Sequence, residues 1–192
     1  VENPGDAEEE PIIEDITELS LLDPASGSGH ILVVGFELLM QMYREAGYNA
    51  RQAVRSILRN NLFGLDIDLR AVQLSRFALL LKAAEYDPEI LKFSFKGGPE
   101  GILPHVYTFP EKTSIGSEST EAFLGKEGYE YIAELRDNIN LLQEGKNIGS
   151  ALQLDLSENA RMHILEQAKH FIQQPDIHWE ELKGFIEPLL VM

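Results

Sequence analysis

The chain has 192 residues, of which 44% are hydrophobic and 25% are charged, and its formal net charge is −16. This length is enough for one domain with a buried core, and the composition argues against a wholly disordered or fibrous chain. Only 16 basic residues stand against 32 acidic ones. Because affinity for DNA phosphates comes mainly from Lys and Arg, we expect weak DNA binding, or none, by this chain alone.

Several kinds of site are disfavoured by what the sequence lacks. There is no cysteine, which removes disulfides, thiolate metal sites and cysteine nucleophiles and fits a reducing compartment. His163 and His170 are expected to be a surface pair on a helix, so we predict no metal. The apolar run Ile31 to Met40 is too short to span a membrane, and the acidic N-terminus does not resemble a secretory signal. We therefore expect a cytoplasmic protein without membrane contact.

The first half of the chain predicts strands alternating with helices. Residues 1–15 are rich in Pro, Gly and acidic side chains and are expected to form an acidic flexible tail. Gly47 is a suitable residue to follow a helix, and Asn49 and Asp68 are suitable helix caps. In chain order we expect a strand at 19–22, helices at 30–46 and 50–58, a strand at 61–67 and a helix at 69–85. This order favours a parallel α/β sheet.

The second half of the chain gives weaker signals. Residues 91–95 (LKFSF) and 105–109 (HVYTF) are β-rich and predict two further strands. Gly- and Ser-rich stretches at 96–101 and 113–120 predict loops. Helices are expected at 127–144, 157–173 and 178–191, with a break at Gln174-Pro175 between the last two. We assign residues 16–192 to one domain, with a helical insertion over about 119–192.

A glycine-rich turn, LLDPASGSGHIL, joins the first expected strand to the first helix. Glycine lets the backbone approach a ligand closely and tolerates positive φ. The helix that follows offers free N–H groups and the positive end of its dipole, which suit a carboxylate or a phosphate. A phosphate-binding loop would need Lys after the last glycine, but His30 follows Gly29. A dinucleotide fingerprint would need Gly or Ala at Leu32, which weakens that alternative.

A second element, GLDID at residues 64–68, ends the second expected strand. An acidic side chain there can accept hydrogen bonds from both hydroxyls of an adenosine ribose. Asp66 follows Gly29 by 37 residues, more than the about 20 of dinucleotide folds, and the extra helix at 50–58 accounts for the difference. Asp68 is expected to cap a helix. Ser26 and Ser28 have no base near them in sequence, so we do not expect either to be a nucleophile.

These residues resemble two motifs of a known family. Residues 23–30 (DPASGSGH) resemble the first motif of adenine-specific DNA methyltransferases, which more often has Cys in the place of Ser26. Residues 60–79 (NNLFGLDIDLRAVQLSRFAL) resemble the segment that follows in large restriction-modification and phage-exclusion enzymes, above all the PglX type of BREX defence systems. The resemblance covers residues 16–85 well and the remainder loosely. It implies the class I (Rossmann-like) S-adenosylmethionine-dependent methyltransferase fold, an α/β fold, incomplete at its C-terminal end.

The resemblance also implies a cofactor, S-adenosyl-L-methionine, and roles for individual residues. Asp23 and the Gly27–Gly29 turn would hold its methionine moiety, Asp66 its ribose hydroxyls, and Ile67 would pack on its adenine. The third motif has a candidate in Asp155, within LQLDL. No catalytic residue is predicted. The expected cofactor-binding residues are Asp23, Pro24, Ala25, Ser26, Gly27, Gly29, His30, Asp66, Ile67 and Asp155.

The parent reaction implied by the resemblance is methyl transfer to the amino group of a flipped-out adenine in DNA. The family builds its adenine pocket with a motif of the form Asn/Asp/Ser-Pro-Pro-Tyr/Phe. Nine prolines occur here and no two are adjacent, so we expect no activity from this chain alone. Because the sequence starts at Val1, without Met, we expect a fragment of a longer enzyme. That enzyme would contact DNA, and other defence-system subunits are further expected partners.

Two alternatives remain open from the sequence. One is an enzyme of another class with a similar turn: a methyltransferase acting on RNA, protein or a small molecule, or a dehydrogenase. The other is a non-catalytic binding or interaction module with the same fold. Binding of S-adenosylhomocysteine but not NAD would favour a methyltransferase over a dehydrogenase, and binding of neither would favour the interaction module.

Overall fold

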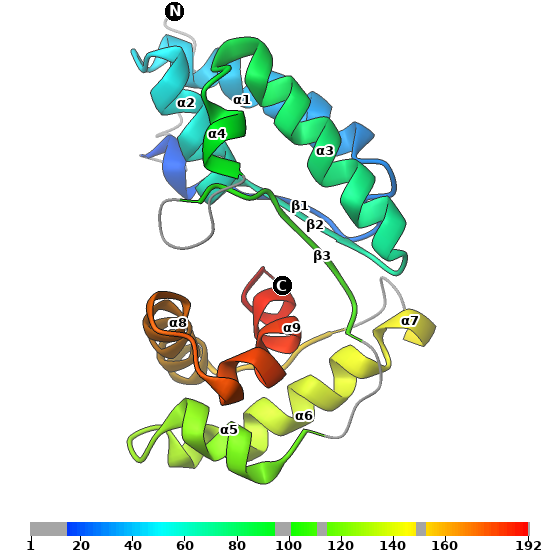
Figure 1. Ribbon diagram of the computed structural model, residues 1–192, viewed down its shortest axis with the longest axis vertical. Coiled ribbons are helices and arrows are strands. Elements are labelled where there is room, and N and C mark those ends of the chain that lie inside the picture. The colour runs from blue at the N-terminus through cyan, green and yellow to red at the C-terminus, as the bar shows by residue number, and fades with distance from the viewer. Residues whose placement is uncertain (1–14, 95–100, 111–114, 149–152, 192) are drawn as a thin grey trace, which may run out of the picture.

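The computed structural model describes residues 15–94, 101–110, 115–148 and 153–191 and contains a three-stranded sheet between two groups of helices (Figure 1). The sheet and the helices on one of its faces come from the first part of the chain. These elements are η1 (Ile16–Glu18), β1 (Leu21–Asp23), α1 (His30–Glu45), α2 (Ala50–Ser56), η2 (Ile57–Asn61), β2 (Leu62–Asp66), α3 (Leu69–Tyr86), α4 (Ile90–Ser94) and β3 (His105–Thr108).

The other face of the sheet is covered by helices from the second part of the chain (Figure 1). These are α5 (Ser117–Leu124), η3 (Tyr129–Tyr131), α6 (Ile132–Gln143), α7 (Gly145–Ile148), α8 (Glu158–Gln173) and α9 (Ile177–Val191). None of the helices in the described ranges is both long enough and apolar enough to cross a membrane.

The three strands are parallel and lie in the order β1-β2-β3. Asp23 at the end of β1 pairs with Gly64, and Asp66 at the end of β2 pairs with Thr108. Since all three strands run in one direction, their carboxyl ends meet at the same edge of the sheet. In parallel α/β sheets this edge is where ligands bind, so the register decides which residues can form a site.

Side chains alternate between the two faces of the sheet, as the pleat of a strand requires. Leu62 and Val106 join a first core with the inner sides of α1, α2 and α3. Leu65 and Phe109 join a second core with the helices from α5 to α9. The strands are therefore buried on both faces, which is typical of parallel sheets.

A buried hydrogen-bond network centred on Asn61 ties the segment before β1 to α1 and α2. The fully buried Asn61 amide donates to the carbonyl oxygens of Ile16 (2.8 Å) and Leu19 (2.6 Å). Its Oδ1 accepts a hydrogen bond from the Tyr43 hydroxyl at 2.9 Å, and that hydroxyl lies 2.7 Å from Ser56 Oγ. Asn61 stands in a π-helical turn, η2, which carries α2 directly into β2.

The structure confirms most elements predicted for the first half and corrects two stretches further along. Residues 91–95 were expected as a strand, but Ile90–Ser94 form α4, which begins after a turn at Asp87 and buries Ile90 in the first core. Residues 113–120 were expected as a loop, but α5 begins at Ser117, and the Ser119 and Thr120 side chains are buried. The loop was predicted because residues 113–120 are mostly polar, but two of these polar side chains are buried in the helix.

Some predictions lie wholly or mostly outside the described residues. These are the acidic tail at 1–15, apart from Asp15, and the loop at 96–101, apart from Gly101.

The strand at 105–109 and the helices at 30–46 and 69–85 are confirmed with small changes at their ends. The helix predicted at 127–144 is divided into a 3-10 turn, η3, and α6.

We predict that Asn61→Ala lowers the free energy of unfolding by about 3 kcal/mol, because it removes the side-chain partner of two carbonyl groups and one of the two partners of the Tyr43 hydroxyl. Urea unfolding followed by circular dichroism measures the change. The neighbouring Asn60 is exposed and donates a hydrogen bond to Ser56 Oγ at 3.1 Å, so Asn60→Ala should stay within about 0.5 kcal/mol of the parent chain. Equal effects of the two substitutions would contradict a structural role for the network.

Candidate functional site

The predicted glycine-rich turn leaves the carboxyl end of β1 and leads into α1. Asp23 is 7% exposed, and its Oδ1 accepts a hydrogen bond from the backbone N–H of Ala25 at 3.2 Å. The turn then approaches β2, where the Ser26 N–H donates to the Leu65 carbonyl at 2.8 Å. Gly27 and Gly29 have φ of 52° and 84°, values that glycine adopts without the strain another residue would carry.

Gly29 is required by a close contact as well as by its φ. A Cβ atom placed on it would lie 2.4 Å from Ser75 Oγ and 3.0 Å from Ser75 Cα, on α3. Glycine therefore lets the turn lie directly against α3. The hydroxyls of Ser26 and Ser75 are buried and have no hydrogen-bond partner in the described part of the chain, so two polar groups lie under the turn without a bond of their own.

Asp66 joins the two predicted motifs. Its Oδ2 accepts a hydrogen bond from the backbone N–H of Gly27 at 2.7 Å, and its Oδ1 accepts one from the N–H of Asp68 at 2.9 Å. A carboxylate offers about four lone-pair positions, so each oxygen retains capacity for another donor. The carboxylate can thus bind the turn and two further hydroxyl groups together.

The residues beside Asp66 and Gly29 are available to a ligand. Ile67 is 55% exposed at the carboxyl edge of the sheet, and His30 is exposed at the start of α1. Asp68 caps α3 through a 2.9 Å hydrogen bond to the N–H of Arg70, as the sequence predicted. The first-motif residues and Asp66 are thus brought to one edge of the sheet.

The predicted third-motif residue, Asp155, lies in a different environment. It belongs to the segment between α7 and α8, and its side chain is exposed. Its backbone N–H and carbonyl both bond the side chain of Asn138 on α6, at 2.9 and 2.8 Å. No hydrogen bond between described residues links Asp155 to the turn or to Asp66, and its role in cofactor binding stays a prediction.

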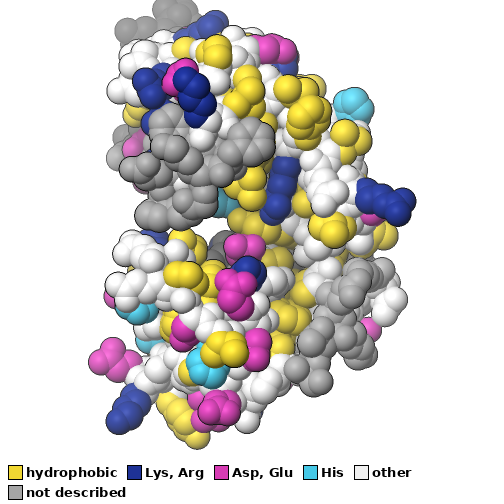
Figure 2. Space-filling model, in the orientation of Figure 1, with side chains coloured by type: hydrophobic (Ala, Val, Ile, Leu, Met, Phe, Trp, Pro, Cys, Tyr) yellow, Lys and Arg dark blue, Asp and Glu magenta, His cyan; other side chains and the backbone are white. Residues whose placement is uncertain are grey.

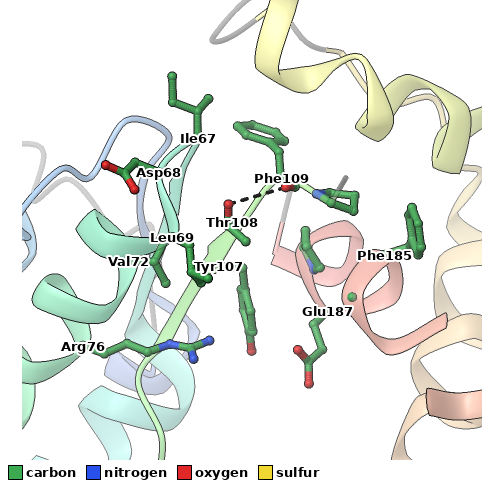
Figure 3. Close-up of a pocket in the computed structure, with 13 residues that line it drawn as sticks. Ile67, Asp68, Leu69, Val72, Arg76, Tyr107, Thr108, Phe109, Phe185 and Glu187 are labelled. Atoms are coloured by element: carbon green, nitrogen blue, oxygen red, sulfur yellow. Dashed lines mark hydrogen bonds between the residues drawn. The ribbon is translucent and has the colours of Figure 1, made fainter. Parts of the chain in front are cut away.

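An open cleft of about 770 Å³ begins at this edge and runs between α3, β3 and α9 (Figure 3). Its volume is in the range of small-molecule sites. The walls are mostly apolar, and the side chains with polar groups are Asp68, Arg76, Tyr107, Thr108 and Glu187. The lining residues are Ile67, Asp68, Leu69, Val72, Arg76, Tyr107, Thr108, Phe109, Pro110, Gly184, Phe185, Glu187 and Pro188.

The end of the cleft farthest from Ile67 holds the oppositely charged side chains of Arg76 and Glu187 around the half-buried ring of Tyr107. Arg76 Nε donates to the Val106 carbonyl at 2.8 Å, and its guanidinium lies 5.5 Å from the centre of the Tyr107 ring. The Tyr107 hydroxyl is 2.7 Å from Nδ1 of His105. Figure 3 shows Arg76, from α3, and Glu187, from α9, on opposite sides of Tyr107.

Burial dominates the electrostatics of this group. It raises the pKa of Tyr107, an effect to which the Glu187 charge adds, and it lowers the pKa of Arg76. It also raises the pKa of Glu187, against the opposing effect of the nearby Arg76 charge. These three residues were not predicted as site residues, because their sequence positions are far apart and no local pattern connects them.

The sequence predicted that His163 and His170 form a surface pair on a helix and bind no metal. Across the described ranges, no three His, Asp or Glu residues are arranged as a metal site would need. His163 differs from the expected surface position, since it is half-buried and its Nε2 lies 2.8 Å from the Leu124 carbonyl oxygen. His170 is exposed, as expected.

We predict that Gly29→Ala destabilises the fold by about 3 kcal/mol, through positive φ together with overlap against Ser75. Gly27→Ala is the matched control, because its φ is also positive but a Cβ there meets nothing within 4 Å, and we expect a cost of about 1 kcal/mol. Urea unfolding of both variants measures the difference. If the two variants lose equal stability, the contact with α3 does not constrain the turn.

We predict that Glu187→Gln becomes more stable relative to the parent chain as the pH rises. The pKa of Glu187 is raised in the folded state, so the unfolded chain loses this proton first and the parent loses stability between the ordinary and the raised pKa. Glutamine removes that loss. The stability difference should be constant below about pH 4 and grow as the pH rises from the ordinary pKa of a glutamate to the raised pKa of Glu187.

Urea unfolding at a series of pH values measures this difference, with Glu127→Gln at an exposed position as the control. A stability difference for Glu187→Gln that is independent of pH, or that shrinks as the pH rises, would contradict a raised pKa for this half-buried carboxyl group.

The sequence of the chain is similar to regions of several known proteins. No protein-family model matches the chain. Adenine-specific methyltransferase BrxX of Escherichia coli O9:H4 (strain HS) is 32% identical over 187 residues, covering 90% of this chain and 15% of that protein. Adenine-specific methyltransferase PglX of Lacticaseibacillus casei (strain Zhang) is 34% identical over 143 residues, covering 74% of this chain and 11% of that protein.

A second protein named adenine-specific methyltransferase PglX, from Streptomyces coelicolor (strain ATCC BAA-471 / A3(2) / M145), is 38% identical over 68 residues, covering 34% of this chain and 6% of that protein. The chain thus spans 15% or less of the length of each of these relatives. The first two matches include most of the chain at more than 30% identity. The chain is therefore homologous to one region of the PglX- and BrxX-type adenine-specific methyltransferases.

Proposed function

We propose that this chain is the cofactor-binding portion of a DNA adenine methyltransferase with the class I (Rossmann-like) fold, and that its cofactor is S-adenosyl-L-methionine. The observation that carries the proposal is the 2.7 Å hydrogen bond from the Gly27 N–H to Asp66. It brings a glycine turn, a helix N-terminus and a carboxylate together at the carboxyl edge of a parallel sheet. The names of the relatives support the same activity.

The residues at this edge fit the parts of the cofactor. The turn and the N-terminus of α1 offer N–H groups to the carboxylate of the methionine moiety. Asp66 retains lone pairs for the two ribose hydroxyls, and the exposed Ile67 offers an apolar surface to the adenine ring at the mouth of the cleft. Asp23 supports the start of the turn through its bond to the Ala25 N–H, and His30 lies beside the turn.

When bound, the cofactor supplies an activated methyl group. The residues of this chain hold and orient it, and the adenine that accepts the methyl group needs a separate pocket. With a net charge of −16, this portion is poorly suited to gripping DNA phosphates. We assign DNA contact, and any association with other defence-system subunits, to the longer protein.

A dinucleotide-binding dehydrogenase fits the turn less well. The position at which the dinucleotide fingerprint has its third glycine or alanine carries Leu32, which is fully buried. Its side chain fills the space beside Gly64, where a Cβ atom would lie 2.8 Å from Leu32 Cδ1. The helix and strand are therefore spaced for a leucine. Binding of S-adenosylhomocysteine but not NAD tests this choice directly.

We predict that Asp66→Ala weakens S-adenosylhomocysteine binding about 10- to 100-fold, because hydrogen bonds to a charged acceptor contribute about 1.5–3 kcal/mol. Isothermal titration calorimetry gives the affinity, and circular dichroism confirms the fold. Asp68→Ala is the control, since that carboxylate caps α3. It should cost about 1 kcal/mol of stability and leave the affinity nearly unchanged. Unaltered affinity in a folded Asp66→Ala variant would refute the ribose assignment.

We predict that the chain alone transfers no methyl group, even where it binds the cofactor. None of its nine prolines is adjacent to another, so the Pro-Pro motif that forms the adenine pocket in the resembling family is absent. A tritium-transfer assay on adenine-containing DNA, run after cofactor binding is established, should remain at the level of a protein-free blank. Turnover above that blank would mean that another segment of this chain forms the adenine pocket.

A further inference from the structure

The outward side of α1 carries a line of exposed apolar residues. Ile31, Val34, Leu38 and Met42 are 60%, 57%, 56% and 42% exposed. Their spacing of three or four residues places them along one face of the helix. The opposite face carries Leu32, Phe36 and Leu39, among other residues of the first core. Helix α1 is thus apolar on both sides, whereas a surface helix normally presents polar residues to water.

Helix α3 repeats this pattern. Leu74, Phe77 and Leu81 are 53%, 59% and 47% exposed and follow one another at three and four residues. Val72 and Leu79, on the other side of the helix, are buried in the first core. We call the seven exposed residues of α1 and α3 the outer apolar face.

The two lines of residues belong to one surface. Helices α1 and α3 lie against each other and run in the same direction, since each follows a strand of one parallel sheet. Gly29, at the N-cap of α1, lies against Ser75 in the second turn of α3, and Lys82 Nζ bonds Glu37 Oε1 at 2.7 Å further along. Both inner sides face the sheet, so both exposed lines face away from it. Figure 2 shows hydrophobic side chains gathered over this part of the molecule.

The exposed area of the outer apolar face can be compared with the apolar patches of monomers and with protein interfaces. At roughly 200 Å² for a large side chain, seven that are about half exposed present on the order of 700 Å². The largest apolar patch of an ordinary monomer is about 300–600 Å², and a stable interface buries about 800 Å² on each partner. The outer apolar face therefore approaches the size of an interface. The ion pair between Lys82 of α3 and Glu37 of α1 crosses between its two lines of apolar residues, and Glu85 bonds the same lysine.

We propose that the outer apolar face is a docking surface for a segment of the same polypeptide outside these 192 residues. The relatives support this occupant, because the matched region is only 15% of BrxX and 11% of PglX. A region of this kind is joined covalently to a much larger body of protein. An apolar segment of that body reaches the face at high effective concentration, ahead of a second copy or a separate protein.

Site-specific photo-cross-linking in the full-length protein tests the proposal. The photoreactive residue p-benzoylphenylalanine replaces Phe77 on the outer apolar face or, in the control, Met162, which is 64% exposed on α8. After irradiation, mass spectrometry identifies the joined peptides. We expect Phe77 to join a peptide of the same molecule from outside residues 1–192, at several times the yield found for Met162. Cross-links between two copies, or no yield above the control, would overturn the proposal.

A second measurement covers the case in which the cross-linker disturbs the fold. The triple substitution Val34→Gln, Phe77→Gln and Leu81→Gln should lower the unfolding temperature of the full-length protein by several degrees but leave that of the 192-residue chain unchanged. Met162→Gln with Ile172→Gln, both exposed on α8, is the control. Equal shifts in the long and short proteins would overturn the proposal. Neither measurement uses the cofactor, so failure here is distinct from failure of the proposed function.

Discussion

The candidate site depends on the parallel pairing of β1 with β2. Because both strands run in the same direction, the turn after β1 and the acid after β2 meet at one edge, although Gly27 and Asp66 are 39 positions apart. The Asp66 carboxylate then holds the turn in place by accepting a hydrogen bond from the Gly27 N–H. The charge that would bind a ribose thus also shapes the turn that would bind the methionine moiety, so the two halves of the site are not independent.

Local signals in the sequence were enough to predict the turn and the acid that the structure brings together at this edge. The glycines, the acid after the second strand and the caps at Asn49 and Asp68 act through neighbouring backbone, and the structure confirms both caps. The sequence did not reveal that Asp66 already accepts two backbone N–H groups. Which backbone group a side chain bonds across 39 positions depends on the strand register, and periodicity does not determine that register.

The predictions were wrong or missing where tertiary packing determines the secondary structure or brings distant residues together. The stretch LKFSF is β-rich, but Ile90 before it is buried in the first core, and a short helix after Asp87 achieves this burial. The cleft was not predicted at all. Its charged end combines Arg76, Tyr107 and Glu187 from α3, β3 and α9, and only the packing of α9 against β3 brings the third of these residues near the other two.

The two cores explain how distant parts of the chain reach the same edge. Strand β2 contributes Leu62 to one core and Leu65 to the other. Phe185 of α9 packs in the second core with Leu65 and also lines the cleft that opens at Ile67. The helices that follow β3 therefore form one wall of the space beside the proposed adenine position. A change in the packing of α9 would alter that wall while leaving the glycine turn, which rests on α3 and β2, in place.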